Sequence, residues 1–108
     1  MSVDACRSRL DACRKAMQSL REKVTSSRCI RTHKMAALAA ELAHATTPQR
    51  RASLRALKAT EAARYTDNIA GLQNQVARIR VQMSAVRGQM ATEREREQAQ
   101  RALLRKRR

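Results

Sequence analysis

Two adjacent heptapeptides near the start of the chain begin with the same four letters: DACRSRL at residues 4–10 is followed at once by DACRKAM at residues 11–17. When Val3 is placed at position a of a heptad, apolar and thiol side chains recur at alternating spacings of three and four residues. These core positions hold Val3, Cys6, Leu10, Cys13, Met17, Leu20 and Val24. The pattern is typical of the contact seam of a coiled coil, which requires a long helix and a second helix to pack against it.

A second run of core positions follows Pro48, the one proline of the chain. Its members are Leu54, Leu57, Tyr65, Ile69, Leu72, Val76, Ile79, Met83, Val86 and Met90. The 11-residue spacing between Leu54 and Tyr65 marks a local stutter in the heptads. The core position between them falls on Glu61, so we expect this stretch to pack weakly.

The residues just before the second run predict a helix start. Thr47 suits the N-cap of a helix, and Pro48 suits its first position, where a missing N–H group costs no hydrogen bond. We therefore expect one helix over about residues 3–45, a turn at residues 46–48 and a second helix over about residues 48–105.

The predicted fold is all-α, with residues 1–108 forming a single helical unit. This unit is an elongated antiparallel helical hairpin or coiled coil, whose two long helices join near Thr46 and Pro48. A parallel homodimer of one kinked helix is the rival arrangement. In that dimer Cys6 and Cys13 would face their own copies.

Polar side chains interrupt both runs. Ser27, Arg31 and Lys34 occupy core positions of the first run before Leu38 restores it. Either the helix bends there or it continues through a polar patch, and the absence of glycine and proline favours continuity. Beyond Met90 the core positions hold Glu93, Glu97 and Gln100. We expect the basic tail, residues 91–108, to stay helical without a packing seam.

The composition argues against an enzyme. The chain has no Trp or Phe and one Tyr, so it cannot build a thick globular core. No paired carboxylates, glycine-rich phosphate loop or nucleophile beside a base can be found. Cys29 and His33 are four residues apart, with His44 a distant third, and two ligands do not make a metal site. We predict no catalysis, metal, cofactor or small-molecule substrate.

Arginine carries most of the formal net charge of +15. It fills position e of successive heptads in both runs. The first arginine stripe consists of Arg7, Arg14, Arg21 and Arg28, and the second of Arg80, Arg87, Arg94, Arg101 and Arg108. Arg105, Lys106 and Arg107 add to the charge of the basic tail. A solvated helix face is one explanation, and the other is that these side chains bind an acidic surface of another molecule.

Three acidic partners fit such a surface. An acidic protein polymer such as a microtubule is slightly favoured, because the seam covers most of the chain and points to a structural subunit of a larger assembly. RNA is the alternative, bound through its backbone by a ribosomal or organellar ribonucleoprotein subunit, since no aromatic platform is present for stacking. An anionic membrane is disfavoured, because no Trp or Phe can anchor the chain.

Two further expectations concern assembly and compartment. A helical hairpin could also serve as a stalk in a secretion or rotary ATPase complex, a comparison that rests on architecture alone. The odd number of cysteines argues against a disulfide framework and for a reducing intracellular compartment, the cytoplasm or the cytoskeleton. A mitochondrial location stays open because the N-terminus is basic and amphipathic, although Asp4 and Asp11 count against a presequence.

The stretch QRRASLRA, residues 49–56, resembles an acceptor site of a basophilic protein kinase, with Ser53 as the candidate phosphorylation site. The same residues also suit the first turns of the second helix. A kinase generally binds an extended acceptor, so the helix start would have to open first. A phosphate on Ser53 could pair with Arg50 or Arg51.

Overall fold

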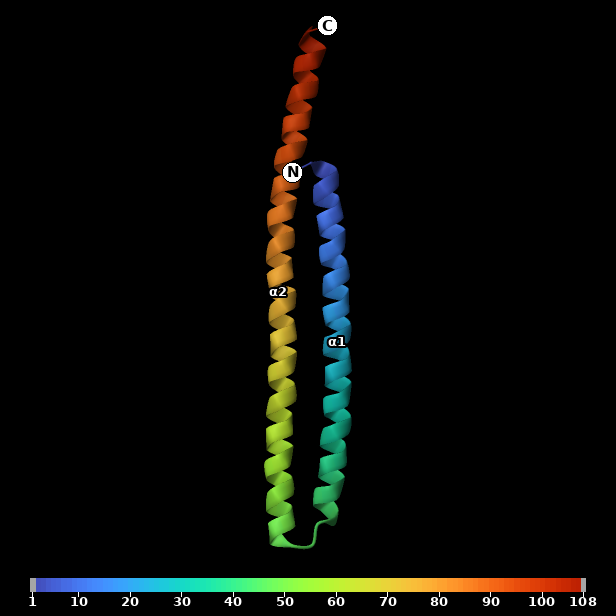
Figure 1. Ribbon diagram of the computed structural model, residues 1–108, viewed down its shortest axis with the longest axis vertical. Helices are drawn as coiled ribbons and strands as arrows, with labels where there is room; N and C mark the ends of the chain where they lie inside the picture. The colour runs from blue at the N-terminus through green and yellow to red at the C-terminus, as the bar shows by residue number, and fades with distance from the viewer. Residues whose placement is uncertain (1, 108) are drawn as a thin grey trace. The chain divides into compact units, whose positions relative to one another are not determined.

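The computed structural model describes residues 2–107 and contains two helices, α1 (Val3–His44) and α2 (Pro48–Arg107) (Figure 1). No strand occurs within those residues. The chain divides into two compact units. Unit 1 comprises Met1–Ser19 and Val76–Arg108, and unit 2 comprises Leu20–Gln75. Each unit pairs a segment of α1 with an antiparallel segment of α2, which confirms the predicted all-α antiparallel hairpin.

Side-chain caps start both helices. The Ala5 amide donates to Ser2 Oγ over 3.1 Å at the beginning of α1. At the beginning of α2 the Arg50 amide donates to Thr47 Oγ1 over 3.2 Å. Because the first amides of a helix lack carbonyl partners within it, such caps fix where a helix begins. The predicted junction is confirmed, with Thr47 as the N-cap and Pro48 as the first helical residue.

The core of unit 1 follows the heptads predicted for it. Its buried cluster consists of Cys6, Leu10, Cys13, Met83 and Val86, with Met17, Ile79 and Met90 packed against it. All eight side chains stand at predicted a or d positions. Burial of apolar surface is the main stabilising term here, at about 25 cal/mol per Å².

A second buried cluster lies at the turn, in unit 2. It consists of Leu38, Ala45 and Leu54, with Met35 and Leu42 packed against it. Ala45, the first residue after α1, joins this cluster, so part of the connection between the helices is itself packed. The turn is therefore held from inside by side chains of both helices.

A polar layer separates this cluster from the rest of unit 2. We use the term for Ser27, Arg31 and Lys34 of α1 and Glu61, Tyr65 and Asn68 of α2. Lys34 Nζ lies 3.4 Å from Glu61 Oε2 and 5.9 Å from the centroid of the Tyr65 ring. Asn68 Nδ2 donates to Ser27 Oγ over 3.4 Å. Helix α1 runs through this layer unbroken, as the sequence predicted.

One predicted core position is wrong. Leu57 was expected in the seam but is 45% exposed, while the neighbouring Lys58 is half-buried. Counting back from Glu61 by three residues, as a heptad requires, leads to Lys58. The hydrophobicity of Leu57 does not overcome the geometry set by Leu54 and Glu61, which place it outside the contact.

The basic tail is helical through Arg107, as predicted. Between residues 91 and 107 only Glu93 is half-buried, and the other side chains are exposed. Packing within unit 1 therefore ends at Glu93, the next core position after Met90. The rest of the tail keeps its helix without a partner among the described residues.

Candidate acidic-partner interface

The arginine stripes lie on the surface. Every stripe member that the structure describes is exposed, and so are Arg105, Lys106 and Arg107. Arg108 lies outside the described residues. Exposure leaves these guanidinium and ammonium groups available to an outside ligand.

In unit 1 the two stripes meet on one side of the helix pair. Position e follows position d by one residue, and the helices face each other through a and d while running in opposite directions. The rotation from d to e therefore turns both stripes toward the same side. That side carries Arg7 and Arg14 from α1 and Arg80, Arg87 and Arg94 from α2.

The other side of the same seam is less basic at its flanking positions. The corresponding g positions hold Arg9, Ala16, Gln82, Gln89 and Arg96. Arg96 is engaged, since its Nη1 lies 2.9 Å from Glu93 Oε1. We call the five arginines at the e positions that flank the packed seam, Arg7, Arg14, Arg80, Arg87 and Arg94, the arginine face.

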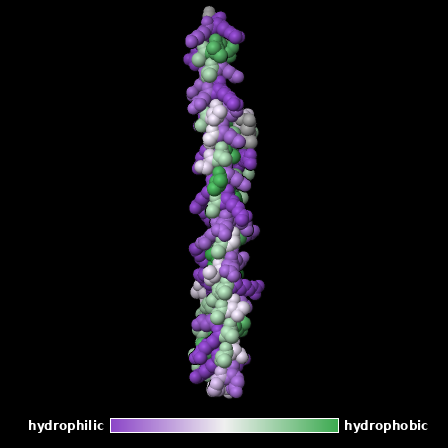
Figure 2. Space-filling model, turned by 90° about the vertical axis from the view of Figure 1, so that its left-hand side faces the viewer, coloured by the Kyte–Doolittle hydropathy of each residue, from purple (hydrophilic) through white to green (hydrophobic). Residues whose placement is uncertain are grey.

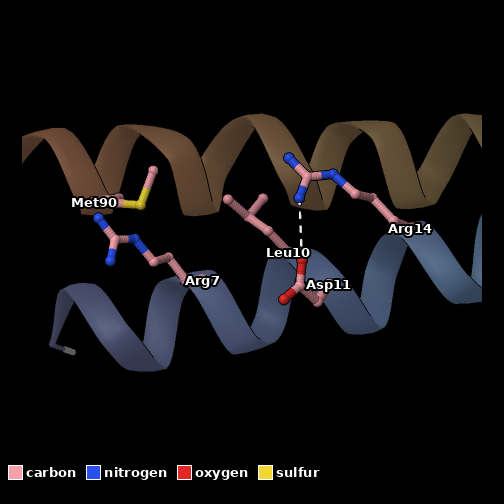
Figure 3. Close-up of a pocket in the computed structure, with 5 residues that line it drawn as sticks. All are labelled: Arg7, Leu10, Asp11, Arg14 and Met90. Atoms are coloured by element: carbon pink, nitrogen blue, oxygen red, sulfur yellow. Dashed lines mark hydrogen bonds and ion pairs between the residues drawn. The ribbon is translucent and has the colours of Figure 1, made fainter.

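A hollow of about 320 Å³ opens on the arginine face. Leu10, Asp11 and Met90 line it together with Arg7 and Arg14. Figure 3 shows the two arginine side chains extending from α1 toward α2, with Met90 beside Arg7. Arg87 and Arg94 precede and follow Met90 by three and four residues, so they lie on the same face of α2 as Met90. The lining thus combines two apolar side chains, two arginines and one carboxylate.

The two rows of the arginine face differ in their ion pairs. Arg14 Nη1 lies 3.1 Å from Asp11 Oδ1, and Arg7 Nη1 lies 3.8 Å from Asp4 Oδ1. Arg80, Arg87 and Arg94 form no ion pair with any residue between 2 and 107. Repulsion among these unpaired charges is a cost that an anionic ligand would relieve.

The stripes do not meet in unit 2. Arg21 and Arg28 continue the first stripe there, but the next two e positions of α2 before Arg80 hold Gln73 and Thr66. The sequence placed all four arginines of the first stripe in one set. In the structure only Arg7 and Arg14 share one side of a helix pair with the second stripe, on α2.

Large apolar side chains are exposed among the arginines of α2. Val81 is 71% exposed and directly follows Arg80, and Leu103 and Leu104 are 58% and 61% exposed within the basic tail. Figure 2 shows hydrophobic atoms among hydrophilic ones at the C-terminal end of the molecule. A surface that mixes cations with leucine and valine suits a protein partner, because a phosphate backbone offers apolar side chains nothing to pack against.

The other sequence candidates belong to unit 2. Ser53 is exposed in the second turn of α2. Cys29 is an exposed free thiol, and within residues 2–107 no three side chains capable of binding a metal come together. Neither helix, over the residues described, has a stretch long and apolar enough to cross a bilayer.

Sequence reasoning missed the contact between Lys34 and Glu61. Both were recognised as polar side chains at core positions, but each on its own helix. Lys34 precedes Pro48 by fourteen residues and Glu61 follows it by thirteen, so counting outward from the turn would have paired them.

Comparison with known proteins adds no relative. The chain matches no protein-family model, no curated protein and no solved structure. Its interpretation therefore rests on its own helices, charges and contacts.

Proposed function

We propose that this protein is a non-catalytic structural subunit of a larger intracellular assembly, which docks its arginine face and basic tail on an acidic partner. The observation that carries the proposal is the meeting of both stripes on one side of unit 1, where Arg80, Arg87 and Arg94 lack ion-pair partners. The e positions of one helix recur about every 10 Å along its axis, because they are seven residues apart and each residue rises about 1.5 Å. Such regular spacing suits a partner that is itself extended and repetitive.

The partner that we favour is an acidic protein polymer such as a microtubule. The support is the exposed Val81 beside Arg80 and the exposed Leu103 and Leu104 in the basic tail. Protein interfaces combine such apolar contacts with charge. RNA backbone is the second candidate, supported by unpaired guanidinium groups that match phosphate geometry.

Co-sedimentation of the full-length protein with polymerised microtubules tests the proposal. Replacing Arg80, Arg87 and Arg94 by Gln should weaken binding about tenfold, if each exposed contact contributes roughly 0.5 kcal/mol. Replacing Arg9, Arg78 and Arg96 by Gln removes the same charge from the other side of unit 1 and is the matched control. Equal losses for both variants would show that total charge, not the arginine face, determines binding.

A salt titration with RNA separates the two partners. Backbone binding through several arginines gives a steep fall of affinity with salt, because condensed counterions are released. Tight RNA binding with such a slope, and no co-sedimentation with microtubules, would replace the favoured partner by the second candidate.

A further inference from the structure

The arginines of the kinase-like motif hold the turn of unit 2 closed. Arg51 Nε donates to the Ala45 carbonyl oxygen over 3.0 Å, in a part-buried contact. Arg50 Nη2 lies 3.7 Å from Glu41 Oε2. Both side chains thus reach back from the first turn of α2 to the end of α1. The two guanidinium groups that a basophilic kinase would bind therefore already contact Ala45 and Glu41.

The residue after the acceptor is also engaged. Leu54 is 4% exposed and packs in the cluster that contains Leu38 and Ala45. Ser53 itself is exposed. The hydroxyl can therefore be reached by solvent while the residues around it, which a kinase must recognise, are held within the fold.

The backbone just before Ser53 is hydrogen-bonded in the first turn of α2. The Arg51 amide donates to the Thr47 carbonyl oxygen over 3.1 Å, and the Arg50 amide donates to Thr47 Oγ1 over 3.2 Å. An extended acceptor requires these bonds to break. Helix ends open at lower free energy than helix centres, so this step can occur without unfolding of the whole chain.

We propose that Ser53 is a concealed phosphorylation site, which becomes a substrate when the turn of unit 2 opens and which then keeps the turn open once modified. The chemistry is ordinary phosphoryl transfer from a nucleoside triphosphate. Ser53 Oγ forms a bond to the γ-phosphorus, the bond from that phosphorus to the bridging oxygen breaks, the nucleoside diphosphate leaves, and the hydroxyl proton passes to the base of the kinase.

The added group would compete for both arginines. A phosphate on Ser53 carries a charge of roughly −1.5 to −2 and lies two and three residues from Arg51 and Arg50. Its oxygens are stronger acceptors for a guanidinium than the Ala45 carbonyl. Arg50 would likewise exchange a long contact with Glu41 for a doubly charged neighbour. Both links from α2 to the end of α1 would then be weakened together.

The first test measures the initial rate of Ser53 phosphorylation in the full-length protein, with the catalytic subunit of cyclic AMP-dependent protein kinase and ATP as the probe. Leu38→Ala should raise this rate about tenfold or more, because a truncation in the turn cluster increases the opened population. Leu10→Ala is the matched control: both leucines are buried, at 7% and 4% exposure, but Leu10 belongs to the cluster of unit 1. Its effect should stay below about threefold.

Further variants limit the interpretation. Glu41→Gln leaves the motif intact, weakens the contact with Arg50 and should raise the rate by about twofold, as expected for an exposed ion pair. Ser53→Ala should abolish the label. A peptide of residues 49–56 gives the rate of the open motif. Labelling of the wild-type protein as fast as this peptide, with helicity unchanged, would overturn the concealment, and so would no labelling of Leu38→Ala.

The second test asks whether the phosphate holds the turn open. Hydrogen exchange of the amides of residues 50–54 should be about tenfold faster in the phosphorylated protein than in the unmodified protein. Exchange in the unit 1 helices, around Leu10 and Val86, should stay the same and serves as the internal control. Unchanged exchange at residues 50–54 would show that the modification does not act on the turn.

Discussion

The cluster of unit 1 and the polar layer of unit 2 fill equivalent positions of the same kind of helix pair with opposite chemistry. In unit 1 the a and d positions bury Cys6, Leu10 and Val86 against one another. In unit 2 the corresponding positions bring Lys34 to Glu61, and Ser27 accepts a hydrogen bond from the exposed Asn68 beside the seam. Periodicity alone therefore decides which residues face the partner helix, whether or not they are apolar.

The difference lies in what each region contributes. Apolar side chains stabilise the pairing but fit many alignments almost equally well. A charged pair at a core position fits only the alignment that brings the two charges together. We infer that the cluster of unit 1 supplies stability, while the polar layer selects the alignment of α1 with α2 in unit 2.

The largest effect is expected from the cluster of unit 1. Leu10→Ala should lower the free energy of unfolding by about 2–4 kcal/mol, the usual cost of truncating a buried leucine. Guanidinium chloride unfolding followed by circular dichroism measures it. Ile30→Ala is the control, because Ile30 is 52% exposed and should change stability little. Similar losses in both variants would contradict the assignment of the core.

A smaller loss is expected when the polar layer keeps its acid and loses its cation. In Lys34→Leu, the Glu61 carboxylate, whose side chain is 14% exposed, retains only Arg64, at 3.9 Å. We expect a loss of about 1–2 kcal/mol, less than for a fully buried pair because the Lys34 side chain is 42% exposed. The same unfolding titration measures this change, and an unaltered midpoint would show that the pair does not contribute.

Replacing both members of the pair should reverse that loss. The free energy of unfolding of the double variant Lys34→Leu with Glu61→Leu should lie within about 1 kcal/mol of the wild-type value or above it. Apolar side chains commonly replace a buried ion pair without loss of stability. In this double variant α1 should pair with α2 in more than one alignment. Sedimentation velocity should then detect more self-association than in the wild type. An unchanged distribution of species would show that the polar layer does not select the alignment.

The smallest effect is expected at the surface of unit 1. Asp11→Asn removes the carboxylate from Arg14, but both side chains are more than half exposed, at 66% and 57%. The expected change in stability is below about 0.5 kcal/mol. Binding to an acidic partner should strengthen instead, because Arg14 becomes free. A co-sedimentation titration against the wild type measures this second outcome.

The sequence predicted the helices well because each boundary has a local cause. Thr47 and Pro48 define the start of α2 through bonds made within one turn. The alternating spacings predicted which residues of unit 1 are buried, since every layer up to Met90 is apolar. The prediction that Leu57 is buried was wrong because the stutter shifts the contact with α1 to Lys58, although Leu57 is the more hydrophobic residue.

The interface was only partly predictable for a different reason. The stripes follow from counting along each helix, and the sequence shows both. Their meeting on one side of unit 1 depends on the antiparallel direction of the helices, which counting within one helix does not supply. The roles of Arg50 and Arg51 likewise depend on where the end of α1 lies, because each reaches a group on the other side of the turn.

The cluster of unit 1 also has a chemical character that polarity scales do not express. Five of its eight side chains contain sulfur: Cys6, Cys13, Met17, Met83 and Met90. The turn cluster of unit 2 has a single sulfur, that of Met35. Peroxide converts a thioether to a polar sulfoxide, which an apolar seam cannot accommodate. The larger of the two buried clusters is therefore the one that holds most of the oxidisable sulfur, while the cluster at the turn consists mainly of leucine and alanine.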